Sequence, residues 1–250
     1  MIRQPDPVAP AYYAASRLLR GRAADWWLLL HPPYTLWHLS YVAIGAALAP
    51  RLDGLRLVVT LAAFFLAVGL ASHALDELND RPLRTSIPAA HLIGIAVLSL
   101  GGAVSLGLWG VSRLGPGLLV FILIGVLLTV GYNLELFGGR LHNDLSFALG
   151  WGGFPVLTAY YAQAERLDLA AVVAAGFACW LSAAQRALST QARTLRRRVA
   201  TVEGTITYLD GGTQEVTSSV LLTPIEVALR ALMWSVATLA AALVLVRLLG

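Results

Sequence analysis

The sequence predicts an all-α, polytopic membrane protein, folded as one helix bundle over residues 1–250. Composition gives the first reason, because 58% of the residues are hydrophobic and only 13% are charged. Soluble domains carry about 25% charged residues. The mean hydropathy of +0.71 agrees. The second reason is the arrangement of the apolar residues, which gather in runs long enough to cross a bilayer, about 20 residues for a helix.

Apolar segments that we predict to span the membrane follow one another with short connections, so no second domain is expected. There are seven of them, namely Tyr34–Pro50, Leu57–Leu78, Pro88–Gly110, Gly117–Phe137, Leu145–Gln163, Leu169–Ser189 and Pro224–Leu249. For the fifth, Asn143 is a candidate N-cap, because a short polar side chain before an apolar run suits a helix start.

Two segments outside these spans have patterns of their own. Residues 11–30 mix arginines with tryptophans and leucines, which predicts a helix lying in the membrane interface. Residues 199–222 form a polar cytoplasmic loop, in which "TITYLDGGTQEV" alternates around Asp-Gly-Gly and predicts a small hairpin. The last span begins with "TPIE", where Thr223 and Glu226 have the spacing of a capping box.

Charge distribution predicts the orientation. All 18 basic residues are arginine, which is typical of a GC-rich bacterial genome. Most of them fall on the side of the bundle that holds the N-terminus, so the positive-inside rule favours a cytoplasmic N-terminus in the bacterial inner membrane. The net charge of +4 does not indicate nucleic-acid binding, because no basic patch interleaves with exposed aromatic residues. The single cysteine, Cys179, excludes an internal disulfide.

An acidic motif, "HALDELNDRP" at residues 73–82, stands where the second span ends. Helix positions four apart share a face, so we expect Asp76 and Asp80 to project together, with His73 one turn below. Such close carboxylates repel unless a cation lies between them. The cation could be a nearby arginine, or Mg²⁺, which binds through one or two carboxylates plus substrate phosphates. The alternative is a solvated helix end with ordinary charge pairing.

The longer stretch "DELNDRPLRTSIP" resembles the first aspartate-rich motif of the UbiA superfamily of intramembrane prenyltransferases, in a compressed form. The resemblance covers about residues 28–191, including "HPPYTLWHLSYVAIGAAL" and "GYNLELFGGRLHNDLSFALGWGGFPVLTAYYAQ". It implies a bundle around a central cavity that holds an isoprenyl diphosphate through Mg²⁺ and transfers the prenyl group to an acceptor. Some relatives instead act as terpene cyclases.

The resemblance also implies roles for particular residues. Asp76 and Asp80 are expected to be the catalytic residues and the Mg²⁺ ligands. The substrate-binding residues are expected to be His73, Glu77, Asn79, Arg81, Arg84, Tyr132, Asn133, Arg140, Gln185, Ser189 and Arg193. The expected partners are the isoprenyl diphosphate and membrane lipid.

The chain departs from the family pattern where the second aspartate-rich motif should stand. No acidic residue occurs between Asp168 and Glu203, and Gln185, Ser189 and Arg193 recur there every four residues. Arginines could supply the positive charge of the missing metal cluster, because a guanidinium matches phosphate oxygens in a bidentate way. The alternative is that these arginines only set the orientation of the chain in the membrane.

The chain also has fewer predicted spans than the family usually has, so a partner subunit or a second copy could complete the cavity wall. Both departures keep another hypothesis open, a non-catalytic protein that binds an isoprenoid or acts as a scaffold in the membrane.

Overall fold

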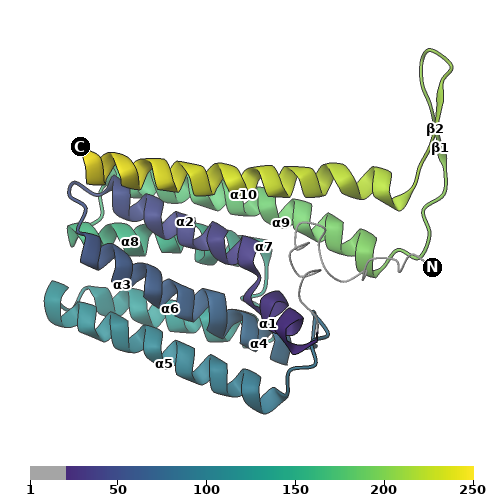
Figure 1. Cartoon of the computed structure of the whole chain (residues 1–250). Helices are drawn as coiled ribbons and strands as arrows, with labels where there is room; N and C mark the ends of the chain where they lie inside the picture. The colour runs from purple at the N-terminus through teal and green to yellow at the C-terminus, as the bar shows by residue number, and fades with distance from the viewer. Residues whose placement is uncertain (1–20) are drawn as a thin grey trace.

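The computed structural model describes residues 21–250, which form an all-α bundle whose long helices run roughly side by side (Figure 1). Four helices in this part of the chain are long and apolar enough to cross a membrane: Gly54–Leu78, Ala89–Leu114, Leu169–Arg197 and Ser218–Leu249. The predicted class, an all-α membrane helix bundle, is therefore confirmed.

The other predicted spans are helical but do not meet the same criteria, so the count of seven is corrected to four among the described residues. α2 (Pro32–Leu48) has 17 residues, or about 26 Å, and α6 (Leu118–Asn133) has 16. The predicted fifth span consists of α7 (Asp144–Phe147), a π-helical segment η3 (Ala148–Gly153) and α8 (Phe154–Ala164). Its glycines, tyrosines and tryptophan make it less apolar than a helix that faces lipid.

The position of α2 explains why a less apolar helix is tolerated. It packs against α8 and α10, and Tyr41 and Val42 are completely buried. A helix surrounded by other helices does not need a lipid-compatible surface. The approach of α8 is close, because a Cβ added to Gly45 would lie 2.3 Å from the backbone oxygen of Val156.

The second predicted span is one continuous column with a changed helical pitch in its middle. It comprises α3 (Gly54–Phe64), the π-helical segment η2 (Phe65–Ser72) and α4 (His73–Leu78). It packs against α5 (Ala89–Leu114). Wider π turns rotate the residues that follow them and often occur at functional sites. Here η2 ends at Ser72 and His73, and η3 contains Trp151.

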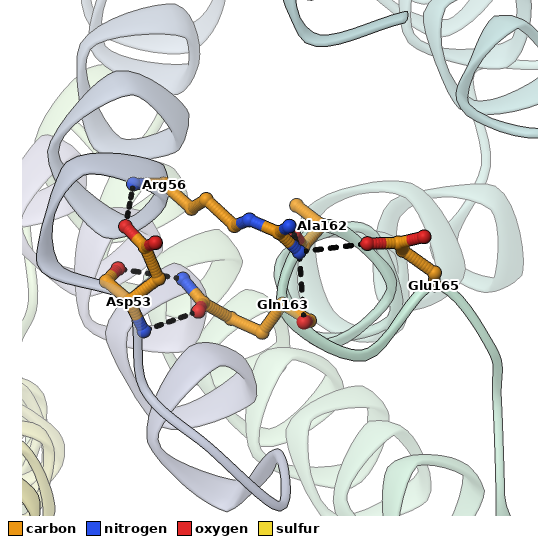
Figure 2. A network of polar contacts seen from close by, with 5 residues as sticks. All are labelled: Asp53, Arg56, Ala162, Gln163 and Glu165. Carbon is orange, nitrogen blue, oxygen red and sulfur yellow. Dashed lines mark hydrogen bonds and ion pairs between the residues drawn. The ribbon is translucent and has the colours of Figure 1, made fainter. Parts of the chain in front are cut away.

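A polar network lies where α3 begins and α8 ends (Figure 2). Arg56 Nη1 donates to the backbone oxygens of Ala162 and Gln163, at 3.3 and 3.1 Å, and pairs with Glu165 at 3.1 Å. The Gln163 side chain in turn accepts from the backbone N–H of Asp53 at 2.7 Å and donates to its carbonyl oxygen at 3.2 Å. This clasp joins the start of α3 to the end of α8.

The two C-terminal helices, α9 (Leu169–Arg197) and α10 (Ser218–Leu249), extend beyond the rest of the bundle (Figure 1). α10 starts at Ser218 with Thr217 as its N-cap, so the predicted start at Thr223 is wrong. The earlier threonine caps the helix because its side chain accepts from the N–H of Val220. Glu226 is then free of a capping role, and it forms a buried ion pair with Arg196 of α9.

The predicted hairpin is confirmed between α9 and α10. β1 (Thr205–Thr207) pairs antiparallel with β2 (Thr213–Glu215), and the hairpin stands clear of the bundle (Figure 1). α1 (Arg22–Leu30) accounts for the last part of the predicted interfacial helix, and residues 11–20 of that prediction lie outside the described residues. Asn143 caps α7 as predicted, accepting from the N–H of Ser146.

Candidate functional site

A polar cavity of about 430 Å³ lies where α2 begins and where α4 and α6 end, with α9 along one side. Three groups of charged or titratable residues line it. The histidines are His31, His38, His73 and His142. The arginines are Arg186, Arg193, Arg197 and Arg198. Asp76 is the one carboxylate among the described lining residues, so the cavity is rich in cationic groups and poor in anionic ones.

Two of the histidines are held by backbone carbonyl groups. The Nδ1 atom of His73 lies 3.1 Å from the carbonyl oxygen of Gly69, and that of His38 lies 3.0 Å from the carbonyl oxygen of Trp151. A carbonyl only accepts, so Nδ1 carries the proton and Nε2 is left as an acceptor in the neutral ring. Both carbonyl oxygens belong to the π-helical segments η2 and η3, which therefore orient these rings.

His31 stands just outside the predicted first span and stacks near His73, with ring centroids 4.6 Å apart. Burial, and then electrostatic interactions with His73, Arg197 and Arg193, hold the pKa of His31 well below its ordinary value of 6.5. Its imidazole is therefore neutral at pH 7. It contributes hydrogen-bonding capacity to the cavity, while the arginines contribute the positive charge.

The acidic motif is divided between the cavity and its surroundings. Asp76 lines the cavity, but α4 ends at Leu78, and Asp80 lies beyond it, exposed, with φ 63°. The helical face that Asp76 and Asp80 were predicted to share is therefore absent. The reason is local: Arg81 precedes Pro82, and a residue before proline is disfavoured in the α conformation.

The residues present consequently do not fit the predicted two-carboxylate magnesium site. In the part of the chain that the structure describes, no group of three or more histidine, cysteine or acidic side chains is arranged to hold a metal ion. The donors around Asp76 are mainly guanidinium and imidazole groups, which suit an anion.

Glu77, a predicted substrate-binding residue, has a structural environment. It is completely buried and accepts hydrogen bonds from the N–H groups of Leu83 and Thr85, at 2.9 and 2.8 Å, and from the Thr85 hydroxyl at 2.8 Å. These bonds hold the turn after α4, in which several non-glycine residues have left-handed φ angles. They are Asp80, Arg81 and Arg84. Each such conformation costs about 1 kcal/mol or more, so the turn depends on Glu77.

Taken together, the predicted site residues fall into two sets. Those lining the cavity are His73, Asp76, Tyr132, Asn133, Gln185, Ser189 and Arg193. Those outside its lining are Glu77, Asn79, Asp80, Arg81, Arg84 and Arg140. Within the second set, Arg81 donates to the carbonyl oxygen of Ile87 at 2.6 Å, and Asn79 donates to that of Asn133 at 3.3 Å. Arg84 and Arg140 are exposed.

An aromatic wall forms one side of the cavity. Tyr132 and Trp151 have ring centroids 4.2 Å apart, and Phe147 stacks on Trp151 at 5.8 Å. Arg186 fixes this wall, because it donates to the Tyr132 hydroxyl at 2.6 Å and lies 5.0 Å above the Phe147 ring. Asp144 pairs with the same guanidinium at 2.5 Å. Arg186 is therefore already neutralised and held in place.

Trp151 also lines a second space, an apolar groove of about 150 Å³ between α3, α5, α6 and α8. The groove leads from Trp151 and Thr129 toward Arg56 and Arg113. Its wall on the second helical column runs from Arg56 to Val68, which is about 18 Å at the helical rise. The clasp around Arg56 (Figure 2) lies at its outer end.

Several lining residues were not among the predicted substrate-binding residues: His31, His38 and His142 were missed, and Arg186 and Arg197 were considered only as neighbours of Arg193 that could supply positive charge. Arg186 and Arg197 had a usable signal, because with Arg193 they follow helical spacing on α9. The histidines had none, since they lie far apart in the chain and meet only through packing.

Comparison with known proteins adds no relative to this description. No protein-family model matches the chain, and no match is found among curated proteins or solved structures.

Proposed function

We propose that this protein is an intramembrane prenyltransferase-like enzyme, which binds an isoprenyl diphosphate and transfers its prenyl group to an acceptor. One observation carries the proposal: a cation-rich cavity and an apolar groove share a lining residue, Trp151. A lipid with an anionic head and a long hydrocarbon tail matches this pair of spaces. The resemblance of the acidic motif to the UbiA superfamily supports the same ligand class.

In this proposal the diphosphate lies among the α9 arginines and the prenyl chain follows the groove toward Arg56. Charged hydrogen bonds to the departing diphosphate lower the barrier when the allylic carbon–oxygen bond breaks and its electron pair leaves with the phosphate. The allylic carbon then lies beside Tyr132, Phe147 and Trp151, whose ring faces stabilise positive charge. An acceptor captures the carbon and loses a proton.

Mg²⁺ was expected from the sequence and remains a prediction. Asp76 is the carboxylate that would hold it in the cavity, and the step described above does not depend on it. The cytoplasmic location of the cavity and the bacterial inner membrane are likewise part of the proposal, because they follow from the arginine distribution. A partner subunit or second copy against the exposed apolar helices is compatible with it.

The test is incubation of the purified protein with geranyl, farnesyl or geranylgeranyl diphosphate, followed by measurement of released pyrophosphate and extraction of prenylated products. Replacing Trp151 by alanine should reduce turnover strongly. Trp180→Ala is the matched control, because Trp151 is 8% exposed and lines both spaces whereas Trp180 is 78% exposed on α9. Absence of turnover and of binding with every diphosphate would refute the proposal.

Groove occupancy can be tested separately through chain length. Ala103 of α5 lines the groove, so Ala103→Phe should shift the preference from geranylgeranyl toward geranyl diphosphate. Ala231→Phe on the exposed side of α10 is the control and should leave the preference unchanged.

A second candidate is a non-catalytic isoprenoid-binding or scaffolding protein, favoured by the presence of a single carboxylate in the described cavity lining. Copurification of a prenylated lipid without turnover would support it. A terpene cyclase is distinguished from a transferase by products formed in the absence of any acceptor.

A further inference from the structure

α9 presents a stripe of arginines to the cavity. Arg186, Thr190, Arg193 and Arg197 are spaced four, three and four residues apart, so they lie on one face of the helix, and all of them line the cavity. This face occupies the place where a second group of carboxylates was expected. The side chains there have charge opposite to that of a metal-binding cluster.

The arginines of this stripe differ in how their charge is balanced. Arg186 is paired with Asp144. Arg193 and Arg197 make no ion pair with any residue from 21 to 250. The hydrogen bond of Arg193 goes to the neutral Thr190 hydroxyl on its own helix, at 3.0 Å. Like charges four residues apart on a helix repel each other, and among the described residues the single carboxylate of Asp76 offsets this repulsion only in part, so a bound anion would relieve the rest.

The opposite wall offers little to a divalent cation. Asp76 lines the same cavity as Arg193 and Arg197, while Asp80 lies outside the lining and Glu77 is fully engaged in the turn after α4. A cation placed at Asp76 would also share the cavity with two guanidinium groups that have no counter-ion among the described residues.

We propose that Arg193 and Arg197 bind the phosphate oxygens of the ligand directly, so that headgroup binding requires no divalent cation. This inference rests on the proposed function and specifies how that site recognises its ligand. The guanidinium fork matches two phosphate oxygens at once, which a lysine or a point charge does not.

The experiment measures binding of farnesyl diphosphate to the full chain in lipid nanodiscs, by calorimetry, with Mg²⁺ and with EDTA. The Kd in EDTA should lie within about threefold of the Kd in Mg²⁺, because the arginines supply the contacts. Inorganic pyrophosphate should compete for the site. The ratio of the Kd of pyrophosphate to that of farnesyl diphosphate gives the contribution of the prenyl tail to the affinity.

Variants identify the residues responsible. Arg193→Gln and Arg197→Gln should each weaken binding in EDTA by roughly 10- to 150-fold, the loss of charged hydrogen bonds. Arg193→Lys should bind more tightly than Arg193→Gln but less tightly than the unchanged protein. Its binding also shows that the fold tolerates a substitution at this position. Arg230→Gln, exposed on α10 and outside the cavity lining, is the matched control. Asp76→Asn should leave the Kd unchanged or lower it, because a negative charge near the anion is removed.

Two failures are distinguishable. If EDTA abolishes binding, Mg²⁺ restores it and Asp76→Asn destroys it, then recognition depends on a metal and this inference is overturned while the proposed function stands. If farnesyl diphosphate binds in neither buffer, the proposed function itself is overturned.

Discussion

The contact between α2 and α8 at Gly45 gives the most direct test of the packing. A Cβ at this position would lie 2.3 Å from the backbone oxygen of Val156 and 2.9 Å from its Cα and carbonyl carbon. All three are backbone atoms, so no rotamer change relieves the clash. Gly45→Ala therefore requires the two helices to separate by about 1 Å, enough to lose a quarter to a half of the dispersion energy across the contact.

The expected cost is about 1–3 kcal/mol, the usual range for overpacking a filled core. The matched control is Gly101→Ala, on α5, where an added Cβ meets nothing within 4 Å. That substitution should be neutral or stabilise the helix by up to about 1 kcal/mol, the difference in helix propensity. In thermal unfolding of the purified protein, a chain of this size should shift by about 2–4 °C per kcal/mol, so Gly45→Ala should melt several degrees below the control.

A second pair of variants shows whether the clash is with backbone or side chain. Gly107→Ala meets the side chain of Ile122 at 2.8 Å, so Ile122→Ala in the same protein should recover part of its loss. Val156→Ala should not rescue Gly45→Ala, because the clashing atoms remain. Equal melting temperatures for Gly45→Ala and Gly101→Ala, or rescue by Val156→Ala, would refute the reasoning.

Three further predictions concern other parts of the molecule. Glu77→Gln should destabilise the protein by about 1.5–3 kcal/mol in thermal unfolding, because an amide cannot accept all the hydrogen bonds that the carboxylate accepts; an unchanged melting temperature would contradict the structural role of Glu77. Glu226→Leu should lower the free energy of unfolding by about 3–5 kcal/mol, because it removes the carboxylate that pairs with Arg196. The double variant Arg196→Leu with Glu226→Leu should recover most of this loss. Equal melting temperatures of the single and double variants would contradict a buried ion pair. Because the pKa of His31 is lowered in the folded state, the unfolded chain binds more protons, and the melting temperature should fall as the pH drops below about 6.5. His31→Asn should make the melting temperature less dependent on pH in this range. The same pH dependence in both proteins would exclude His31 as its source.

The membrane class and the hairpin were predictable because each depends on residues that are neighbours in the sequence. Hydropathy adds up along a helix, and an Asp-Gly-Gly turn between alternating strands forms locally. The number of spans was not predictable in the same way. α2 is an interior helix because other helices surround it, and the sequence of residues 32–48 alone does not indicate those neighbours.

The candidate site shows the same division. Asp76, Tyr132 and Arg193 could be predicted because motif position or helical spacing identifies them. Asp80 was misplaced although Pro82 gave a local signal against a continued helix at Arg81, and the form of the turn after α4 also depends on Glu77, whose bonds reach backbone groups up to eight residues away. His31, His38 and His142 come from three separate parts of the chain, so only the tertiary fold brings them together.

The central place of α2 has a consequence for biosynthesis. α2 is synthesised long before one of its main neighbours, α10, which follows it by about 170 residues in the chain. The Arg247 guanidinium, three residues from the C-terminus, donates to the backbone oxygens of Ala47 and Ala49 at 2.8 and 2.7 Å. The end of α2 is therefore capped only after residue 247 has been synthesised, and a chain truncated before α10 leaves α2 without one of its main neighbours.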